Sequence, residues 1–240
     1  MGPSRDDLRL NMSLLEALPC EAGHWVEQAG SKPQAHPDRS LGNARLRQVH
    51  GTQVWQAKEV LAATANCEGD ALVSDDPGIC LQVITADCVP VLLSDPEGRC
   101  VAAIHAGWRG QVGGVLRTTL ERFAVLAGPC SRPVDWQAFV GAHLSPTRFE
   151  VGEEVAEAFQ TADLGACVRR DLGVKPHVDL AKATRLQLER FGLERITVDE
   201  RCTWECADLP SHRRDVTHGG QARTGRLVTW VRPAPTPRDR

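Results

Sequence analysis

The stretch Thr85-Ala86-Asp87-Cys88-Val89-Pro90-Val91-Leu92-Leu93 stands at the centre of the region that decides the fold. It belongs to a longer segment, residues 69–110, in which short apolar runs alternate with turn sequences. The apolar runs cover residues 71–73, 79–85, 89–93 and 101–104, and the turns are Asp75-Asp76-Pro77-Gly78 and Asp95-Pro96-Glu97-Gly98. Pro fixes and Gly frees the backbone dihedral angles that reverse turns need. The segment therefore predicts a meander of β-strands.

Apolar residues at helical spacing follow this meander. A run at spacings of three and four predicts a helix that ends near Gly128; its members are Val112, Val115, Leu116, Leu120, Phe123 and Leu126. A longer helix is expected to begin after Asp179, a favourable N-cap, and to end at Gly192. A short helix is predicted near residues 153–159, and late strands at residues 136–140, 196–198 and 227–231. This order indicates an α+β fold, an α/β arrangement with a mixed sheet.

Composition divides the chain into three parts. Residues 1–43 show no sustained periodicity, and we expect a helix fragment followed by irregular loop. Residues 44–232 carry the periodic segments and predict a single domain, because 240 residues suffice for one core of ordinary size. Residues 233–240 are polar and Pro-rich, and we expect a disordered tail.

Charge and cysteine content narrow the classes of partner and compartment. With 28 basic and 31 acidic side chains the net charge is −3, so no broad cationic surface is available for nucleic acid or an anionic membrane. Small-molecule partners are expected instead. Nine widely spaced cysteines, an odd number, indicate a reducing compartment. No run resembles a secretory signal or a membrane span, which predicts a cytoplasmic protein.

Three side chains that are common zinc ligands stand at the ends of predicted elements: His50, Cys88 and His105. Zinc favours imidazole nitrogen and thiolate sulfur, and a catalytic site uses three protein ligands with one position open for water. The separations of 38 and 17 residues are too long to show a shared site by themselves. Spacing alone favours a simpler interpretation, in which Cys88 is a small buried apolar side chain and backbone groups satisfy both imidazoles.

The same side chains permit a second chemistry. Cys88 and His105 are candidates for a thiolate–imidazolium dyad in acyl transfer, with Asp87 or another acid orienting the ring. A metal would hold Cys88 as a ligand, whereas a hydrolase needs this thiolate free to attack, so metal content separates the two. Asp87 is a candidate general base or partner of a ligand, and an Asp that accepts backbone N–H groups at a turn is an equally simple interpretation.

Arginines are candidates for binding an anionic substrate. Arg109 lies between Gly107-Trp108 and Gly110, where the glycines let a phosphate approach its planar guanidinium. The simpler interpretation is a surface Arg packed on Trp108. Arg213 and Arg214 form a second cationic pair beside Asp215, although adjacent arginines are usually solvated or salt-bridged.

Taken together, the ordered strings of this chain resemble one family. They are Arg47-Gln48-Val49-His50-Gly51, Gly69-Asp70-Ala71-Leu72-Val73, the stretch at residues 85–93, His105-Ala106-Gly107-Trp108-Arg109-Gly110, Phe149-Glu150-Val151-Gly152, Asp179-Leu180, Cys202-Thr203, Ser211-His212-Arg213-Arg214-Asp215 and Thr224-Gly225-Arg226. They are similar to the bacterial laccase-domain family, also called multicopper polyphenol oxidase, whose members are described as zinc-dependent purine nucleoside phosphorylases with adenosine deaminase activity. The resemblance covers roughly residues 44–231, and several ordered strings are more specific than any single one.

The resemblance implies a fold and a metal site. The fold is a four-layer α/β/β/α sandwich similar to a deamidating, cysteine-hydrolase-like toxin domain. The metal ligands fall on His50, Cys88 and His105, which reverses the simpler interpretation of these residues. Zn²⁺ is the expected cofactor, and Cu²⁺ is a substitute that such donors would also accept. The family's usual N-terminal segment has no clear counterpart in residues 1–43.

The resemblance also implies substrates and roles. The expected partners are phosphate and a purine nucleoside (adenosine, inosine, guanosine or S-methyl-5′-thioadenosine), with hydrolytic deamination of adenosine as a second reaction. The zinc site is expected to activate water for attack on the purine C6, with Cys88 and Asp87 in the catalytic set. Arg109, with Arg213 or Arg214, is expected to position phosphate near the ribose C1′. Arg47, which stands where the family usually has Asn, is a further substrate-binding candidate.

The sequence leaves three rival functions open. One is a protein that binds nucleosides, or edits peptidoglycan precursors, without nucleoside turnover. Another is a copper-dependent polyphenol oxidase, although the eight His contain none of the paired HxH segments that a trinuclear copper cluster needs. The third is the Cys88–His105 hydrolase.

Overall fold

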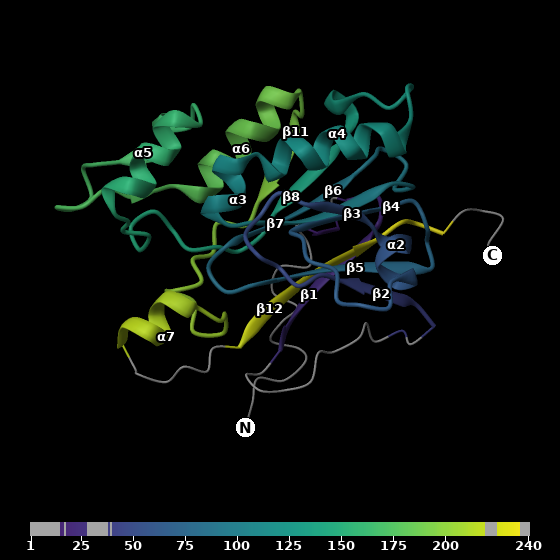
Figure 1. The fold of residues 1–240 in the computed structure, drawn as a ribbon, viewed down its shortest axis with the longest axis horizontal. Coiled ribbons are helices and arrows are strands. Elements are labelled where there is room, and N and C mark those ends of the chain that lie inside the picture. Colours follow the sequence, from purple (N-terminus) through teal and green to yellow (C-terminus); the bar gives the residue numbers. More distant parts are fainter. Residues whose placement is uncertain (1–14, 17, 28–37, 39, 219–224, 236–240) are drawn as a thin grey trace.

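The computed structural model describes residues 15–16, 18–27, 38, 40–218 and 225–235. Two β-sheets lie face to face in it, with helices over the outer face of the larger sheet (Figure 1). The six-stranded sheet has the order β11 (Arg195–Val198), β8 (Gln137–Val140), β6 (Val89–Ser94), β7 (Val101–Ala106), β4 (Ala71–Ser74) and β3 (Val54–Gln56). The four-stranded sheet has the order β1 (Glu21–Glu27), β12 (Arg226–Arg232), β5 (Ile79–Thr85) and β2 (Gly42–Arg45).

The helical layer covers the face of the six-stranded sheet that points away from the smaller sheet (Figure 1). It comprises α3 (Trp108–Gly113), α4 (Val115–Ala127), α5 (Glu153–Thr161) and α6 (Leu180–Phe191). The remaining elements are α2 (Ala57–Ala62), α7 (His212–His218), the 3-10 turns η2 (Pro133–Asp135) and η3 (Gly165–Cys167), and a hairpin of β9 (Val168–Arg169) and β10 (His177–Val178). The mixed α/β fold is confirmed. The described residues show one helical layer and two sheet layers, and no second helical layer is seen in them.

Strand periodicity explains why the central strands are apolar throughout. In β6, Val91 packs under the helices while its neighbour Leu92 packs against the four-stranded sheet. In β7, Ile104 and Ala103 divide in the same way. Successive side chains of a strand point to opposite faces, and both faces are buried here. The continuous apolar runs of the sequence therefore mark the middle of a layered sandwich.

The turn and helix-cap residues identified in the sequence form the turns and helix ends that were predicted from them. The turn at residues 95–98 joins β6 to β7, and the Asp95 carboxylate accepts the Cys100 N–H at 2.9 Å. Gly98 has φ +70°, and a Cβ there would overlap the Pro19 carbonyl, so both conformation and space require glycine. Helix α6 begins after Asp179, whose carboxylate accepts the Lys182 N–H at 2.9 Å.

The remaining predicted helices and late strands are also present. Helices α4 and α6 are closed by the C-cap residues Gly128 and Gly192, both in accord with the sequence. The helix expected from Val112 onward is interrupted at Gly114, where φ is +92°, and so forms α3 and α4. The predicted helix at residues 153–159 is α5, and the strands β8, β11 and β12 lie where they were expected.

The meander prediction was wrong for one strand. Strand β5 does not pair with its sequence neighbours β4 and β6; it pairs with β12 and β2 in the other sheet. Turn signals report only that the chain reverses, whereas the choice of sheet depends on partners far away in sequence. The chain therefore crosses between the sheets at residues 75–78 and again at residues 86–88, and Asp87 and Cys88 lie on the second crossover.

The expectation of an irregular N-terminal segment also needs correction. Within residues 1–43, β1 is a regular strand of seven residues that pairs antiparallel with β12. Leu15 and Leu18 pack into the core between the sheets. These contacts are long-range, so no local periodicity announces them. Of the tail expected to be disordered, residues 233–235 are described, and the Ala234 N–H donates to Gly98; residues 236–240 lie outside the described part.

Candidate metal centre and substrate cavity

Three long-separated side chains meet at one end of the sandwich. His50 lies in the loop between β2 and β3, Cys88 precedes β6, and His105 is in β7. One possible ligand atom from each lies within 4.8 Å of the other two. The His50 and His105 rings meet edge to face, with centroids 4.7 Å apart. The pairing of β6 with β7 sets Pro90 opposite His105 and so carries Cys88 to this end of the sheet.

Asp70, directly before β4, orients the His105 imidazole and holds the backbone that carries His50. Its carboxylate lies 2.7 Å from the His105 Nδ1, which leaves Nε2 of that ring for a metal. The same carboxylate accepts backbone N–H groups of His50 at 2.9 Å and Gly51 at 2.6 Å. His50 has φ +58°, a conformation that few residues other than Gly adopt, and these hydrogen bonds hold it there. The sequence analysis quoted Asp70 in the string at residues 69–73 but assigned it no role.

The donors fit zinc. Two imidazoles and one thiolate, with a carboxylate behind one imidazole, are donors of the types that zinc prefers. Gly107 leaves the necessary space, because a Cβ there would lie 2.6 Å from the His50 Nδ1 and 3.2 Å from the Cys88 Sγ. Within the described part of the chain, this is the one cluster of potential metal ligands.

The electrostatics of the cluster favour a thiolate. Burial opposes the charged form of Cys88, but hydrogen bonds with His105 and His50 outweigh it and lower the pKa of the Cys88 thiol to about 7. Burial also opposes the imidazolium of His105, yet its hydrogen bonds with Asp70 and Cys88 raise the pKa of His105 to about 9. By contrast, burial raises the pKa of Cys80 and of Cys100 to about 12. In the absence of metal, both shifts favour a thiolate on Cys88 beside an imidazolium on His105.

Alkylation tests this charge state. In metal-free protein we expect iodoacetamide to modify Cys88 at a rate that rises through a midpoint near pH 7, because the thiolate is the nucleophile. Zn²⁺ should suppress the labelling, and the buried Cys80 and Cys100 should stay unlabelled in the folded protein. Peptide mass spectrometry reads each cysteine separately. Labelling of Cys88 that rises only above pH 9, or that ignores zinc, would contradict this assignment.

The cluster opens into a cavity of about 400 Å³, a size typical of small-molecule sites. The walls combine apolar side chains with a few polar and cationic ones. The apolar lining comes from Ile84, Trp108, Leu144, Phe149 and Leu180, and the polar and cationic lining from Gln48, Thr85, His212, Arg213 and Arg226. His212 and Arg226 belong to strings that the sequence analysis quoted without assigning them a role.

The four arginine candidates separate into different environments. Arg213 lines the cavity, and its guanidinium lies 5.5 Å from the Phe149 ring. Arg109 and Arg47 are exposed and are not among the cavity-lining residues; Arg109 stacks on Trp108 at 4.3 Å, and Arg47 pairs with Glu68. The simpler interpretation of Arg109, a surface Arg on Trp108, therefore agrees with the geometry.

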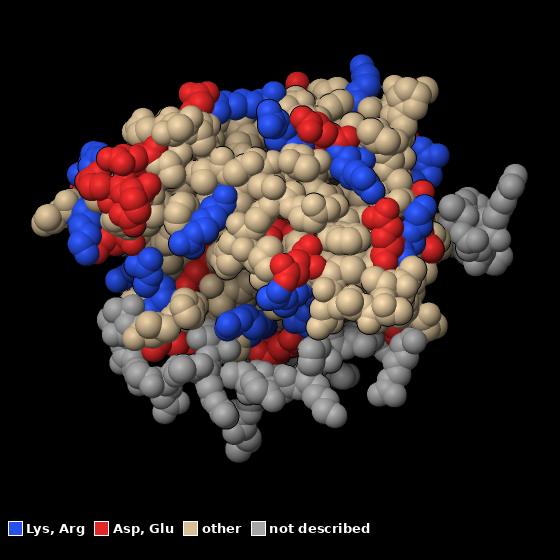
Figure 2. All heavy atoms as spheres, viewed as in Figure 1, with Lys and Arg blue, Asp and Glu red and all other residues tan. Residues whose placement is uncertain are grey.

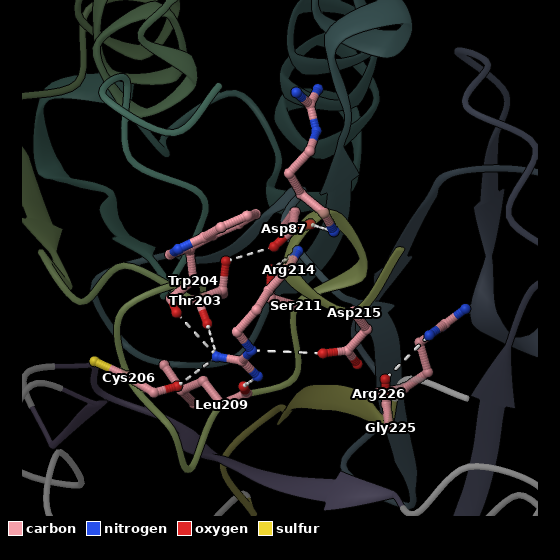
Figure 3. Close-up of polar contacts among 11 residues, drawn as sticks. Asp87, Thr203, Trp204, Cys206, Leu209, Ser211, Arg214, Asp215, Gly225 and Arg226 are labelled. Carbon is pink, nitrogen blue, oxygen red and sulfur yellow. Dashed lines mark hydrogen bonds and ion pairs between the residues drawn. The ribbon is translucent and has the colours of Figure 1, made fainter. Parts of the chain in front are cut away.

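Arg214 has a structural environment (Figure 3). Its guanidinium donates to four backbone carbonyls at 2.7 to 3.1 Å and also lies 3.5 Å from the Asp215 carboxylate. The carbonyls belong to Thr203, Trp204, Cys206 and Leu209. These contacts occupy the guanidinium, so the pair of arginines divides into one cavity residue and one structural residue.

Asp87 is a hydrogen-bond acceptor on both sides. One carboxylate oxygen accepts the Thr203 hydroxyl at 2.6 Å and the other accepts the Arg213 N–H at 2.6 Å. This is the turn-anchoring role that the sequence left open beside general-base catalysis. The backbone of Asp87 adopts φ +91°, and its carbonyl accepts the Leu144 N–H at 3.0 Å.

The surface shows no region of a single charge sign on the face seen in Figure 2, where basic and acidic side chains are intermixed. Several of them pair, for example Arg170 with Glu153 at 2.7 Å and Arg148 with Glu205 at 3.1 Å. This agrees with the net charge of −3. No helix in the described ranges is long and apolar enough to cross a membrane.

Comparison with known proteins decides the family. Residues 31–233 match the family described as multi-copper polyphenol oxidoreductase laccase. The chain belongs to this laccase family. The resemblance noted in the sequence is thereby confirmed, and with it a family linked to metal binding.

Relatives in the laccase family carry a different name. A Deinococcus radiodurans protein named purine nucleoside phosphorylase is 44% identical over 178 residues, which cover 74% of this chain and 67% of that protein. An Escherichia coli K12 protein named purine nucleoside phosphorylase YfiH is 40% identical over 192 residues, covering 78% and 72%. The names of these relatives support an enzyme.

Solved structures agree with the fold. A Neisseria meningitidis protein superposes with a TM-score of 0.71 at 35% identity, covering 81% of this chain and 76% of that one. YlmD from Geobacillus stearothermophilus superposes with a TM-score of 0.75 at 24% identity, covering 90% and 93%. At 24% identity, the similarity to YlmD supports the fold alone.

Proposed function

We propose that this chain is a zinc-dependent purine nucleoside phosphorylase. The observation that carries the proposal is the opening of the His50, Cys88 and His105 cluster into a cavity that has an apolar wall and two lining arginines. The names of the relatives at 40–44% identity supply the substrate class. We extend it to adenosine, inosine, guanosine and S-methyl-5′-thioadenosine as nucleosides.

The residues of the cavity suit the two substrates. Phe149, Trp108 and Leu180 offer flat and apolar surface to a purine. Arg213 and Arg226 line the same cavity and can bind phosphate with planar, charged donors. In phosphorolysis a phosphate oxygen bonds to the ribose C1′ as the C1′–N9 bond breaks, and the purine leaves with the electron pair and takes a proton. The arginines would thus position the phosphate and offset its negative charge.

His50, Cys88 and His105 would hold the metal, and Asp70 would fix the ring of His105. Zinc supplies a Lewis acid and a means of activating water when bound. Copper would occupy the same donors, since Cu²⁺ binds most nitrogen and sulfur sites more tightly than Zn²⁺.

A second reaction, hydrolytic deamination of adenosine, is favoured by the donor set. Zinc deaminases of nucleobases use ligands of the same types, histidine and cysteine, and a nearby acid for proton transfer. Asp87 is the acidic side chain among the cavity-lining residues that the structure describes, and both its oxygens already accept hydrogen bonds. Because these bonds make Asp87 a poor proton carrier, we expect deamination to be slower than phosphorolysis.

Product analysis tests both reactions. Zinc-loaded protein is incubated with adenosine or inosine, with and without phosphate, and adenine, inosine and hypoxanthine are separated by chromatography. Adenine that requires phosphate supports phosphorolysis, and inosine formed without phosphate supports deamination. No purine product at zinc saturation would refute the enzyme proposal and favour a nucleoside-binding or precursor-editing protein.

The same preparation distinguishes the phosphorylase from a cysteine hydrolase and from a polyphenol oxidase. A cysteine hydrolase needs the Cys88 thiolate free, so zinc should inhibit it. A polyphenol oxidase requires copper, whereas the described residues bring together three donors in one cluster rather than the several copper sites of such an oxidase. The nine free thiols support our inference of a reducing, cytoplasmic location.

Substitution of the cavity arginine tests the phosphate site. We expect Arg213→Gln to raise the KM for phosphate by about 10- to 100-fold, because it removes a charged hydrogen-bond donor worth about 1.5–3 kcal/mol. The KM for the nucleoside should change less. Arg117→Gln, on the exposed face of α4, is the matched control. Arg109→Gln tests the role expected from sequence, and an effect as large as that of Arg213→Gln would contradict the placement of Arg109 outside the cavity.

A further inference from the structure

We propose that Asp87 is a positioning residue, which ties helix α7 and its cavity-lining side chains to the crossover that carries the ligand Cys88. The kinetic consequence rests on the proposed function. The structural link between Asp87 and helix α7 does not depend on that function, and hydrogen exchange tests it separately. The proposal replaces the proton-carrying role that the sequence suggested for this carboxylate.

Asp87 links three segments that are remote in sequence. Its backbone carbonyl accepts the backbone N–H of Leu144. One oxygen of its carboxyl group accepts the Thr203 hydroxyl, and the other accepts the backbone N–H of Arg213. Both hydrogen bonds to the carboxyl group are 2.6 Å long, and the residue as a whole is 9% exposed. Hydrogen bonds this short to the oxygens of a buried carboxyl group restrain the groups that make them. Cys88 follows directly in the chain, so these bonds connect a metal ligand with the cavity wall.

The partner segment is locked in turn by Arg214. By binding the carbonyls of residues 203–209, its guanidinium holds that loop in the shape in which the Thr203 hydroxyl reaches Asp87 (Figure 3). The backbone N–H of Arg214 also donates at 3.1 Å to the hydroxyl of Ser211, the residue directly before α7. The loop and the helix therefore form one unit, which Asp87 contacts at both Thr203 and Arg213.

Helix α7 depends on such contacts because it has only seven residues. Isolated helices of this length are unstable in water, so tertiary contacts must place it. The helix brings His212 and Arg213 to the cavity. The Arg213 guanidinium is held further by a hydrogen bond to the Glu150 carbonyl at 3.0 Å. Loss of the Asp87 bonds should therefore displace the group that we expect to bind phosphate.

Asparagine and alanine at position 87 separate positioning from proton transfer. In Asp87→Asn the amide oxygen can accept the Arg213 N–H while the amide nitrogen donates to the Thr203 hydroxyl, which can also act as acceptor. Asparagine thus keeps both contacts but cannot carry a proton near neutral pH. Alanine keeps neither contact. A positioning role predicts that asparagine rescues function and alanine does not.

The experiment compares these variants as zinc-loaded full-length protein, with Asp171→Asn and Asp171→Ala as exposed controls. For Asp87→Ala we expect at least about a tenfold rise in the KM for phosphate, weaker binding of inorganic phosphate by calorimetry, and faster amide hydrogen exchange in residues 203–216. For Asp87→Asn we expect changes within about threefold and near-native exchange. If Asp87→Ala does not fold, Thr203→Val removes one of the two bonds and should shift the same readouts in the same direction.

Two results would overturn the proposal. One is an Asp87→Asn enzyme as impaired as Asp87→Ala, with native exchange in both, which would assign proton transfer to this carboxylate. The other is native exchange and native phosphate binding in Asp87→Ala. If wild-type protein forms no purine, the proposed function fails, while hydrogen exchange still decides whether Asp87 ties α7 to the crossover.

Discussion

Cys88→Ala should abolish stoichiometric zinc binding and reduce purine formation by about 10³-fold or more. The variant removes the one sulfur donor of the cluster and leaves two imidazoles, fewer ligands than a catalytic zinc site requires. A bound metal contributes several kcal/mol to the transition state, and each 1.36 kcal/mol is a factor of ten in rate. Elemental analysis and product chromatography on the same samples measure both effects.

A matched cysteine separates ligand loss from thiol loss. Cys130→Ala removes an exposed thiol and should retain both zinc and activity. Cys88→Ser keeps the size of the side chain but replaces a soft thiolate with a hydroxyl, so it should also lose zinc. A Cys88→Ala protein that still binds one zinc per chain would show that the metal lies elsewhere.

Asp70→Ala should lower the free energy of unfolding by about 3–5 kcal/mol, because it breaks a buried charged pair and leaves its partners unmatched. Those partners are the His105 ring and the backbone N–H groups of His50 and Gly51. Zinc affinity should fall by about 10- to 100-fold, since His105 loses the group that orients it. Denaturant unfolding of metal-free protein and competition with a chelator measure the two effects.

The dependence of folding stability on pH is a further test of the role of Asp70. Burial by itself would raise the pKa of Asp70, but hydrogen bonds from His105 and the backbone outweigh it and lower that pKa. A carboxylate with a lowered pKa stabilises the folded state above its unfolded pKa, and this stability is lost as pH falls through the folded pKa. Wild-type protein should therefore lose stability in acid more steeply than Asp70→Ala. Asp171→Ala, which breaks an exposed pair with Arg169, should leave the free energy of unfolding nearly unchanged, because solvent screens this pair. Equal losses in the two variants would contradict the role of Asp70.

Short-range interactions explain which elements could be predicted from the sequence. Helix α6 has a capping Asp179 and a closing Gly192, and the β6–β7 turn has the residues that its dihedral angles require. Such preferences act over a few residues and need no partner. The candidate ligands were also readable, because imidazole and thiolate are recognisable as donors wherever they stand.

Pairing between distant segments was not readable in the same way. Nothing near β5 indicates that it leaves its sequence neighbours for β12, and nothing in residues 21–27 announces an edge strand. Asp70 and Arg214 acquire their roles only through contacts with groups brought to them by the fold. Arg109, in a favourable sequence setting, lies instead on the surface against Trp108.

Residue chemistry and short-range turn and helix preferences determined the donors, most helices and the central hairpin. The tertiary structure alone decided that His50, Cys88 and His105 meet, that Asp70 stands behind them, and that one of two adjacent arginines faces the cavity while the other binds backbone carbonyls. The reason is physical: sheet pairing and burial are settled by groups far apart along the chain, which a local pattern cannot specify.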